Sequence, residues 1–147
     1  MNRLEVYCII LRSPDDVFAF LTDFTRLNSW RRLSDLRIEP QAPPHVGARL
    51  HMIVQGVVRR MKFTNEVVQL DPSRRFYSDR SIAGPFAIQN SWKVEACDGG
   101  SRVVWTTEFE TGGVNRLFAT IFRRAIRRRE MKELKTLRHI LENDSTR

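Results

Sequence analysis

Six polar side chains fall on the otherwise apolar faces of segments that alternate as β-strands do. They are Arg59, Asn65, Ser78, Arg80, Asn90 and Thr107. A polar group inside a protein costs free energy unless it is paired, and a buried arginine requires an anion or several acceptors. An arginine beside Asn90 and Ser78 would suit a carboxylate, enolate or phenolate group of an amphipathic ligand. Alternatively, Arg59 and Arg80 lie near strand ends and reach solvent, or a bulge shifts the register.

The strand expected over residues 76–82 alternates poorly, and two registers are open. In the first register Phe76, Ser78 and Arg80 face inward, whereas Tyr77 and Asp79 face outward. In the reversed register Tyr77 and Asp79 face inward, where a tyrosine–aspartate pair could do acid/base work on an enolisable substrate.

Other catalytic and metal-binding patterns are missing from the sequence. His45, His51 and His139 lack the spacing of metal ligands, and Cys8 and Cys97 form neither a metal motif nor a disulfide framework. The sequence also contains no Gly-rich phosphate loop and no Gly-x-Ser-x-Gly motif. We therefore expect no metal and no cofactor, and we assign no catalytic residue, which leaves open whether the chain is an enzyme.

The elements that position these side chains follow from hydrophobic spacing. The prediction is a strand over 3–11, short helices after Ser13 and over 24–30, strands around 36–38, 50–54, 57–67, 76–82, 86–94 and 103–109, and a helix over 114–142. Ser13 and Pro14 suit the capping and first positions of a helix. A run of strands with helices at both ends indicates an α+β fold, in which one face of an antiparallel sheet is covered.

The apolar faces of these strands should point toward the long helix. The inward set is Leu50, Met52, Met61, Phe63, Phe76, Ile88, Trp92, Trp105 and Phe109, with Phe118 and Phe122 opposite on the helix. Methionine and aromatic side chains make an adaptable apolar surface. These residues either fill a core or line a space that a curved sheet and one helix leave between them.

The long helix carries two apolar stripes and most of the excess charge. Its first half would bury Phe118, Phe122, Ala125 and Ile126, and its second half Leu134, Leu137, Ile140 and Leu141. The stripes are rotated relative to each other, which predicts a bend near residues 127–130 or packing of the second half on another part of the sheet.

The chain has 147 residues and a formal net charge of +8, and many of its basic residues lie between positions 116 and 138. The basic helix is interpreted as a solvated face, with contact to nucleic acid or an anionic membrane as the alternative. Glu130 and Glu133 interrupt the charge run, and on the basic side of the helix no aromatic residues lie between the charges to stack on bases. Without a long apolar run or a signal-peptide pattern, a cytoplasmic location is the default expectation.

The order of these elements and several local stretches resemble the polyketide cyclase/dehydrase and lipid-transport family of the START-like (SRPBCC) superfamily. The matching stretches are residues 13–18 with Trp30, 46–49, 67–76 and 99–110, followed by the basic final helix. The resemblance covers nearly the whole chain, 1–147, as one domain. It implies a helix-grip fold, in which a curved seven-stranded antiparallel sheet surrounds the C-terminal helix and a cavity lies between them.

The resemblance also implies a function. Family members bind lipids, sterols, polyketides or other hydrophobic compounds, and some are cyclases or aromatases. The leading hypothesis is binding of a small hydrophobic or aromatic ligand, with a cyclase-, aromatase- or dehydratase-type enzyme as the alternative. The predicted ligand-binding residues are Met52, Arg59, Met61, Phe63, Phe76, Ser78, Arg80, Ile88, Asn90, Trp92, Trp105, Thr107, Phe118 and Phe122. A homodimer through a sheet edge or the apolar second half of the helix remains open.

Overall fold

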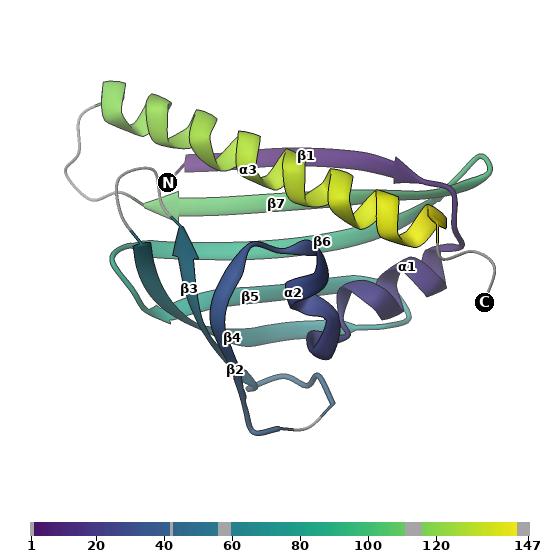
Figure 1. The fold of residues 1–147 in the computed structure, drawn as a ribbon, viewed down its shortest axis with the longest axis horizontal. Helices are drawn as coiled ribbons and strands as arrows, with labels where there is room; N and C mark the ends of the chain where they lie inside the picture. The colour runs from purple at the N-terminus through teal and green to yellow at the C-terminus, as the bar shows by residue number, and fades with distance from the viewer. Residues whose placement is uncertain (1, 42, 56–59, 111–115, 144–147) are drawn as a thin grey trace.

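A computed structural model describes residues 2–41, 43–55, 60–110 and 116–143, which form a seven-stranded sheet and a long helix across it (Figure 1). The strands are β1 (Asn2–Ile10), β2 (Leu33–Glu39), β3 (Arg49–Gln55), β4 (Arg60–Asp71), β5 (Phe76–Ala83), β6 (Ala87–Cys97) and β7 (Gly100–Glu110). The helices are α1 (Pro14–Leu21), the 3-10 turn η1 (Phe24–Arg26), α2 (Leu27–Trp30) and α3 (Arg116–Asn143).

The sheet is antiparallel throughout, with the strand order β1-β7-β6-β5-β4-β3-β2. Helix α3 runs over one face of the sheet and contacts β1 and α2 (Figure 1). The predicted α+β helix-grip architecture, with a curved sheet around a C-terminal helix, is confirmed.

The short helices begin where the capping residues predict. The Ser13 hydroxyl accepts a hydrogen bond from the Asp16 backbone N–H at 3.2 Å, and Pro14 occupies the first turn of α1. The second predicted helix is divided into η1 and α2, and the Asp23 carboxylate accepts from the Thr25 backbone N–H at the start of η1. The helices are too short to be stable alone, so packing must hold them on the sheet.

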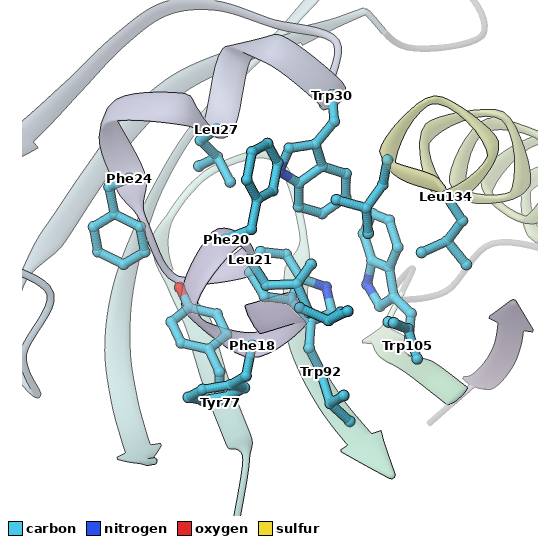
Figure 2. Close-up of a cluster of buried hydrophobic side chains, with 14 of the residues drawn as sticks. Phe18, Phe20, Leu21, Phe24, Leu27, Trp30, Tyr77, Trp92, Trp105 and Leu134 are labelled. Atoms are coloured by element: carbon cyan, nitrogen blue, oxygen red, sulfur yellow. The ribbon is translucent and has the colours of Figure 1, made fainter. Parts of the chain in front are cut away.

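Aromatic side chains fill the part of the fold beneath α1 and α2. Trp92 of β6 lies between neighbouring rings, with centroid distances of 5.3 Å to Trp30, 4.7 Å to Tyr77 and 5.9 Å to Trp105. Figure 2 shows these rings together with apolar side chains of α1, η1 and α2 and with Leu134 of α3. This aromatic core closes one end of the space between the sheet and α3.

The register of β5 is the reverse of the first register considered from the sequence. Tyr77 pairs with Trp92 and Asp79 pairs with Asn90, and all four side chains are buried. The pairing of β4 with β5 shifts between Val67 and Gln69, an irregularity of the kind that a β-bulge produces. Tyr77 and Asp79 therefore face inward.

The prediction that Phe76, Ser78 and Arg80 face inward is wrong. Phe76 pairs with Lys93 and Ser78 pairs with Ser91, which places both on the opposite face of the sheet. Arg80 is exposed to solvent. Since side chains alternate along a strand, reversing the register moves all three away from α3.

Candidate functional site

A pocket of about 290 Å³ lies between the sheet and the middle of α3. Its floor comes from β3, β4, β6 and β7, and residues of α3 and the end of α2 cover it. The predicted residues that line it are Met52, Met61, Phe63, Ile88, Asn90, Trp105 and Phe122. On β6, Ile88 and Asn90 line the pocket, whereas Trp92 further along belongs to the aromatic core, so the pocket begins where the packed rings end.

Other predicted residues lie outside the pocket lining. Trp92 and Thr107 face inward, but Trp92 is enclosed by other rings and the Thr107 hydroxyl is bonded to Glu130. Phe118 is 46 % exposed and stacks against Phe122 on the same helix, and it is not part of the lining. Arg59 lies outside the described residues.

A buried hydrogen-bond network centred on Asp79 lies next to the pocket. Oδ2 of Asp79 accepts from the Tyr77 hydroxyl at 2.6 Å, and Oδ1 accepts from the side-chain amides of Asn65 at 3.0 Å and Asn90 at 3.3 Å. Burial raises the pKa of Asp79, although the hydrogen bond from Tyr77 opposes the shift. Burial and the neighbouring Asp79 raise the Tyr77 pKa well above its ordinary value, so the phenol stays protonated.

This network fixes the orientation of two amides that line the pocket. Oδ1 of Asn90 accepts from Trp105 Nε1 at 3.1 Å, and it lies 3.4 Å from the Thr107 hydroxyl. Asn65 Nδ2 is committed to Asp79, and Asn65 Oδ1 is buried with no hydrogen-bond partner among the described residues. The Asn65 oxygen is therefore a free acceptor.

Glu130 of α3 brings a carboxyl group into the same lining. Its side chain is 4 % exposed, and Oε2 lies 2.5 Å from the Thr107 hydroxyl. Oε1 is buried without a hydrogen-bond partner in the described part of the chain. Burial raises the Glu130 pKa from 4.5 to about 7, against the hydrogen bond to Thr107, which lowers it. Glu130 therefore changes protonation state near neutral pH.

The geometry around Thr107 is consistent with a neutral Glu130. One hydroxyl proton cannot serve both Glu130 Oε2 and Asn90 Oδ1, although both oxygens are within reach. If Glu130 is protonated, it donates to the Thr107 oxygen, and Thr107 is free to donate to Asn90. The protonated state thus satisfies both contacts.

A buried ion cluster completes the polar end of the pocket. Glu133 Oε2 lies 3.7 Å from Arg31 Nε, and Glu133 Oε1 lies 3.2 Å from Arg129 Nε. The Arg31 guanidinium also lies over the ring of Trp105, 5.2 Å from its centroid, in cation–π geometry. One buried carboxylate therefore faces two arginines.

Sequence patterns did not identify Arg31, Glu130 and Glu133 as pocket residues. A signal was present for the two glutamates, because they lie one helical turn before Leu134 and Leu137 of the apolar stripe. In the structure Glu130 and Glu133 are buried and join the two stripes that looked separate in the sequence. No such signal marks Arg31, which follows a short helix and meets Glu133 across the fold.

The described residues show neither a metal-ligand cluster nor a membrane-spanning helix. These residues contain no group of three or more histidine, cysteine, aspartate or glutamate side chains arranged to hold a metal ion. Within the same ranges, no helix is both long and apolar enough to cross a membrane.

The fold and the pocket define a helix-grip protein with a pocket under its C-terminal helix. The family model described as polyketide cyclase / dehydrase and lipid transport matches residues 1–142. The chain belongs to this family. No curated protein matches the sequence.

Solved structures share the fold at low sequence identity. The Zhui aromatase/cyclase from Streptomyces sp. R1128 is 16 % identical with a TM-score of 0.79, covering 96 % of this chain and 93 % of that one. The di-domain aromatase/cyclase BexL from the BE-7585A biosynthetic pathway is 16 % identical with a TM-score of 0.80, and the match covers all of this chain and 48 % of BexL. The major latex-like protein 151 from Panax ginseng is 16 % identical with a TM-score of 0.66, covering 92 % and 97 %. At this identity the likeness is one of fold.

Proposed function

We propose that the protein binds a small hydrophobic or aromatic ligand in the pocket between the sheet and α3. The observation that carries the proposal is the lining, in which Met52, Met61, Phe63 and Phe122 surround a space with polar groups at one end. Ligand sites combine a mostly apolar lining with a few placed polar groups. The volume lies near the lower end of the usual range of roughly 300–1,000 Å³, which favours a compact ring compound over a long-chain lipid.

Membership of a family that includes polyketide cyclases and lipid-transport proteins supports the proposal. Fold similarity to two proteins named aromatase/cyclases adds support for an aromatic or polyketide-like ligand. Because one fold hosts many functions, the test must come from the pocket itself.

The first experiment is native mass spectrometry of purified protein, followed by extraction and identification of any bound compound. Ala125 lines the pocket on α3, so Ala125→Phe should fill the space and remove the bound compound. Ala119 lies on the same helix outside the lining, and Ala119→Phe is the matched control that should keep it. The proposal fails if wild-type protein carries no compound and binds no aromatic probe, or if Ala125→Phe binds like wild type.

A second candidate function is a cyclase- or dehydratase-type reaction in the same pocket, favoured by Glu130. A general acid or base works best when its pKa lies near the working pH, and burial raises the Glu130 pKa to about 7. Tyr77 and Asp79 are not part of the pocket lining, so their acid/base role remains a prediction. Incubation of the extracted compound or its precursors with wild type and Glu130→Gln tests this function, because the variant should bind but lose turnover.

A further inference from the structure

The two oxygens of Glu133 have no hydrogen bond among the described residues but face Arg31 and Arg129 in salt bridges. Two further acceptors at the polar end of the pocket have neither a hydrogen-bond donor nor a salt-bridge partner in the described part of the chain. They are Oδ1 of Asn65 and Oε1 of Glu130, both buried and both without a partner among the residues that the structure describes. The two side chains line the same pocket and are 3 % and 4 % exposed. A buried acceptor without a donor loses the hydrogen bonds that it makes in water, so it normally has a partner.

A flip of the Asn65 side-chain amide would not remove the unpaired acceptor. Asn65 Nδ2 donates to Asp79 Oδ1 at 3.0 Å, and a flipped amide would place a carbonyl oxygen against that carboxyl oxygen. Asp79 is held in turn by Tyr77 and Asn90. The network therefore fixes Asn65 with its oxygen free.

Glu130 Oε1 is an acceptor when the carboxyl is ionised and when it carries its proton on Oε2. If the carboxyl is ionised, the Thr107 hydroxyl donates to Oε2 and Oε1 has no donor. If the carboxyl is protonated, Oε2 donates to Thr107 and Oε1 is still the carbonyl oxygen. Both of these states leave the same acceptor in the pocket lining, and a proton on Oε1 would instead make that oxygen a donor.

The geometry points to a ligand that carries a hydrogen-bond-donating hydroxyl group, a phenol or an alcohol, bound with that hydroxyl beside Asn65 and Glu130 and donating its one proton to Asn65 Oδ1 or to Glu130 Oε1. This inference rests on the proposed function and narrows its ligand class. A carboxylate has no proton to donate to these two acceptors, although basic side chains also line the pocket, two of which, Arg31 and Arg129, already face Glu133. The carboxylate recognition suggested by the sequence depended on Arg59 and Arg80; Arg80 is exposed, and Arg59 lies outside the described residues.

The test compares three probes of similar size at pH 6: 2-naphthol, 2-methoxynaphthalene and 2-naphthoate. Binding is followed by quenching of tryptophan fluorescence, since Trp105 lines the pocket. We expect 2-naphthol to bind about tenfold more tightly than its methyl ether, the effect of one hydrogen bond to an otherwise unpaired buried acceptor. The ether keeps the ring system and loses only the donor.

Variants of Glu130 and Asn65 show which acceptor causes the preference for 2-naphthol over its methyl ether. Glu130→Met removes one acceptor and one buried ionisable group, so it should fold; if Glu130 Oε1 takes the ligand proton, the tenfold preference should fall to about threefold or less. Glu130→Gln keeps a carbonyl oxygen and should retain most of the preference. Asn65→Leu tests the second acceptor, and Met131→Leu is the control, since Met131 adjoins Glu130 on α3 and is 42 % exposed.

The outcomes separate the inference from the proposed function. Equal binding of the naphthol and its ether, tighter binding of the naphthoate, or an unchanged preference in Glu130→Met and Asn65→Leu would overturn the hydroxyl inference and leave the ligand pocket standing. Failure of 2-naphthol to bind also overturns it, and the compound extracted from wild type and Ala125→Phe then decides the proposed function independently.

Discussion

The phenol of Tyr77 donates a 2.6 Å hydrogen bond to Oδ2 of Asp79, and both side chains are buried on the inner face of β5. Because Asp79 also accepts from Asn65 and Asn90, this pair connects the aromatic core to the polar end of the pocket. The aromatic core holds the tyrosine by stacking it on Trp92 at 4.7 Å. The orientation of pocket groups therefore depends on contacts outside the pocket.

Replacement of Tyr77 by phenylalanine should destabilise the fold more at neutral than at acid pH. The change removes a donor from a buried carboxyl, which costs about 1–3 kcal/mol when that carboxyl is ionised. Burial already raises the Asp79 pKa, and loss of the hydrogen bond should raise it further. Unfolding by urea at pH 4 and pH 7 measures the difference. Tyr7→Phe is the control because Tyr7 is 53 % exposed, and equal effects of the two variants would contradict the argument.

The protonation of Glu130 should make the stability of the wild-type protein fall as the pH rises from about 4.5 to about 7. Its folded pKa is raised, so its contribution is fully present below 4.5, decreases through this window and is lost above about 7. The total change is on the order of 3 kcal/mol. The charged groups around it are Arg31 and Arg129, which lower its pKa, and Glu133, which raises it.

Glu130→Gln removes this titration and should unfold at a urea concentration that depends less on pH than in wild type. The free energy of unfolding of the variant should exceed that of wild type by the largest amount above pH 7, where the wild-type carboxylate is ionised and buried. Glu95→Gln, at an exposed position of β6, should retain the wild-type pH profile. If Glu130→Gln and wild type have parallel profiles from pH 4.5 to 8, Glu130 does not titrate in this window.

The sequence predicted the architecture well because hydrophobic spacing is a local signal. Alternation correctly placed Met52, Phe63 and Trp105 on the inner face, and helical spacing placed Phe122 opposite them. It gave the wrong register for β5, where Tyr77 and Asp79 are polar but satisfy each other inside. A pairing of this kind depends on the whole network, which no local pattern reveals.

The polar end of the pocket was harder to predict for a related reason. Glutamates on a basic helix are normally solvated, and Glu133 becomes a buried residue only because Arg31 approaches it from an element far away in sequence. Likewise, Glu130 is held by Thr107 of β7. Both interactions arise from tertiary contacts across the space between helix and sheet.

Glu133 should be among the residues least tolerant of substitution, because its carboxylate neutralises two arginines. Its side chain is 1 % exposed, and Arg31 is 8 % exposed. Removing one partner of a buried ion pair typically costs about 3–5 kcal/mol, so we expect Glu133→Gln to lower the free energy of unfolding by that amount. Glu5→Gln, in the exposed pair with Arg3, should change it little.

The double variant Arg31→Met/Glu133→Leu tests whether the cost comes from the unpaired charge. Removing both partners leaves Arg129, which is partly exposed and donates to the Arg32 carbonyl at 3.1 Å, so much of the stability should return. Urea unfolding of the two single variants and the double variant gives the coupling energy. Strictly additive losses of unfolding free energy would show that Arg31 and Glu133 act independently. If Glu133→Gln lowers the free energy of unfolding no more than Glu5→Gln does, the carboxylate is not needed to balance the buried arginines.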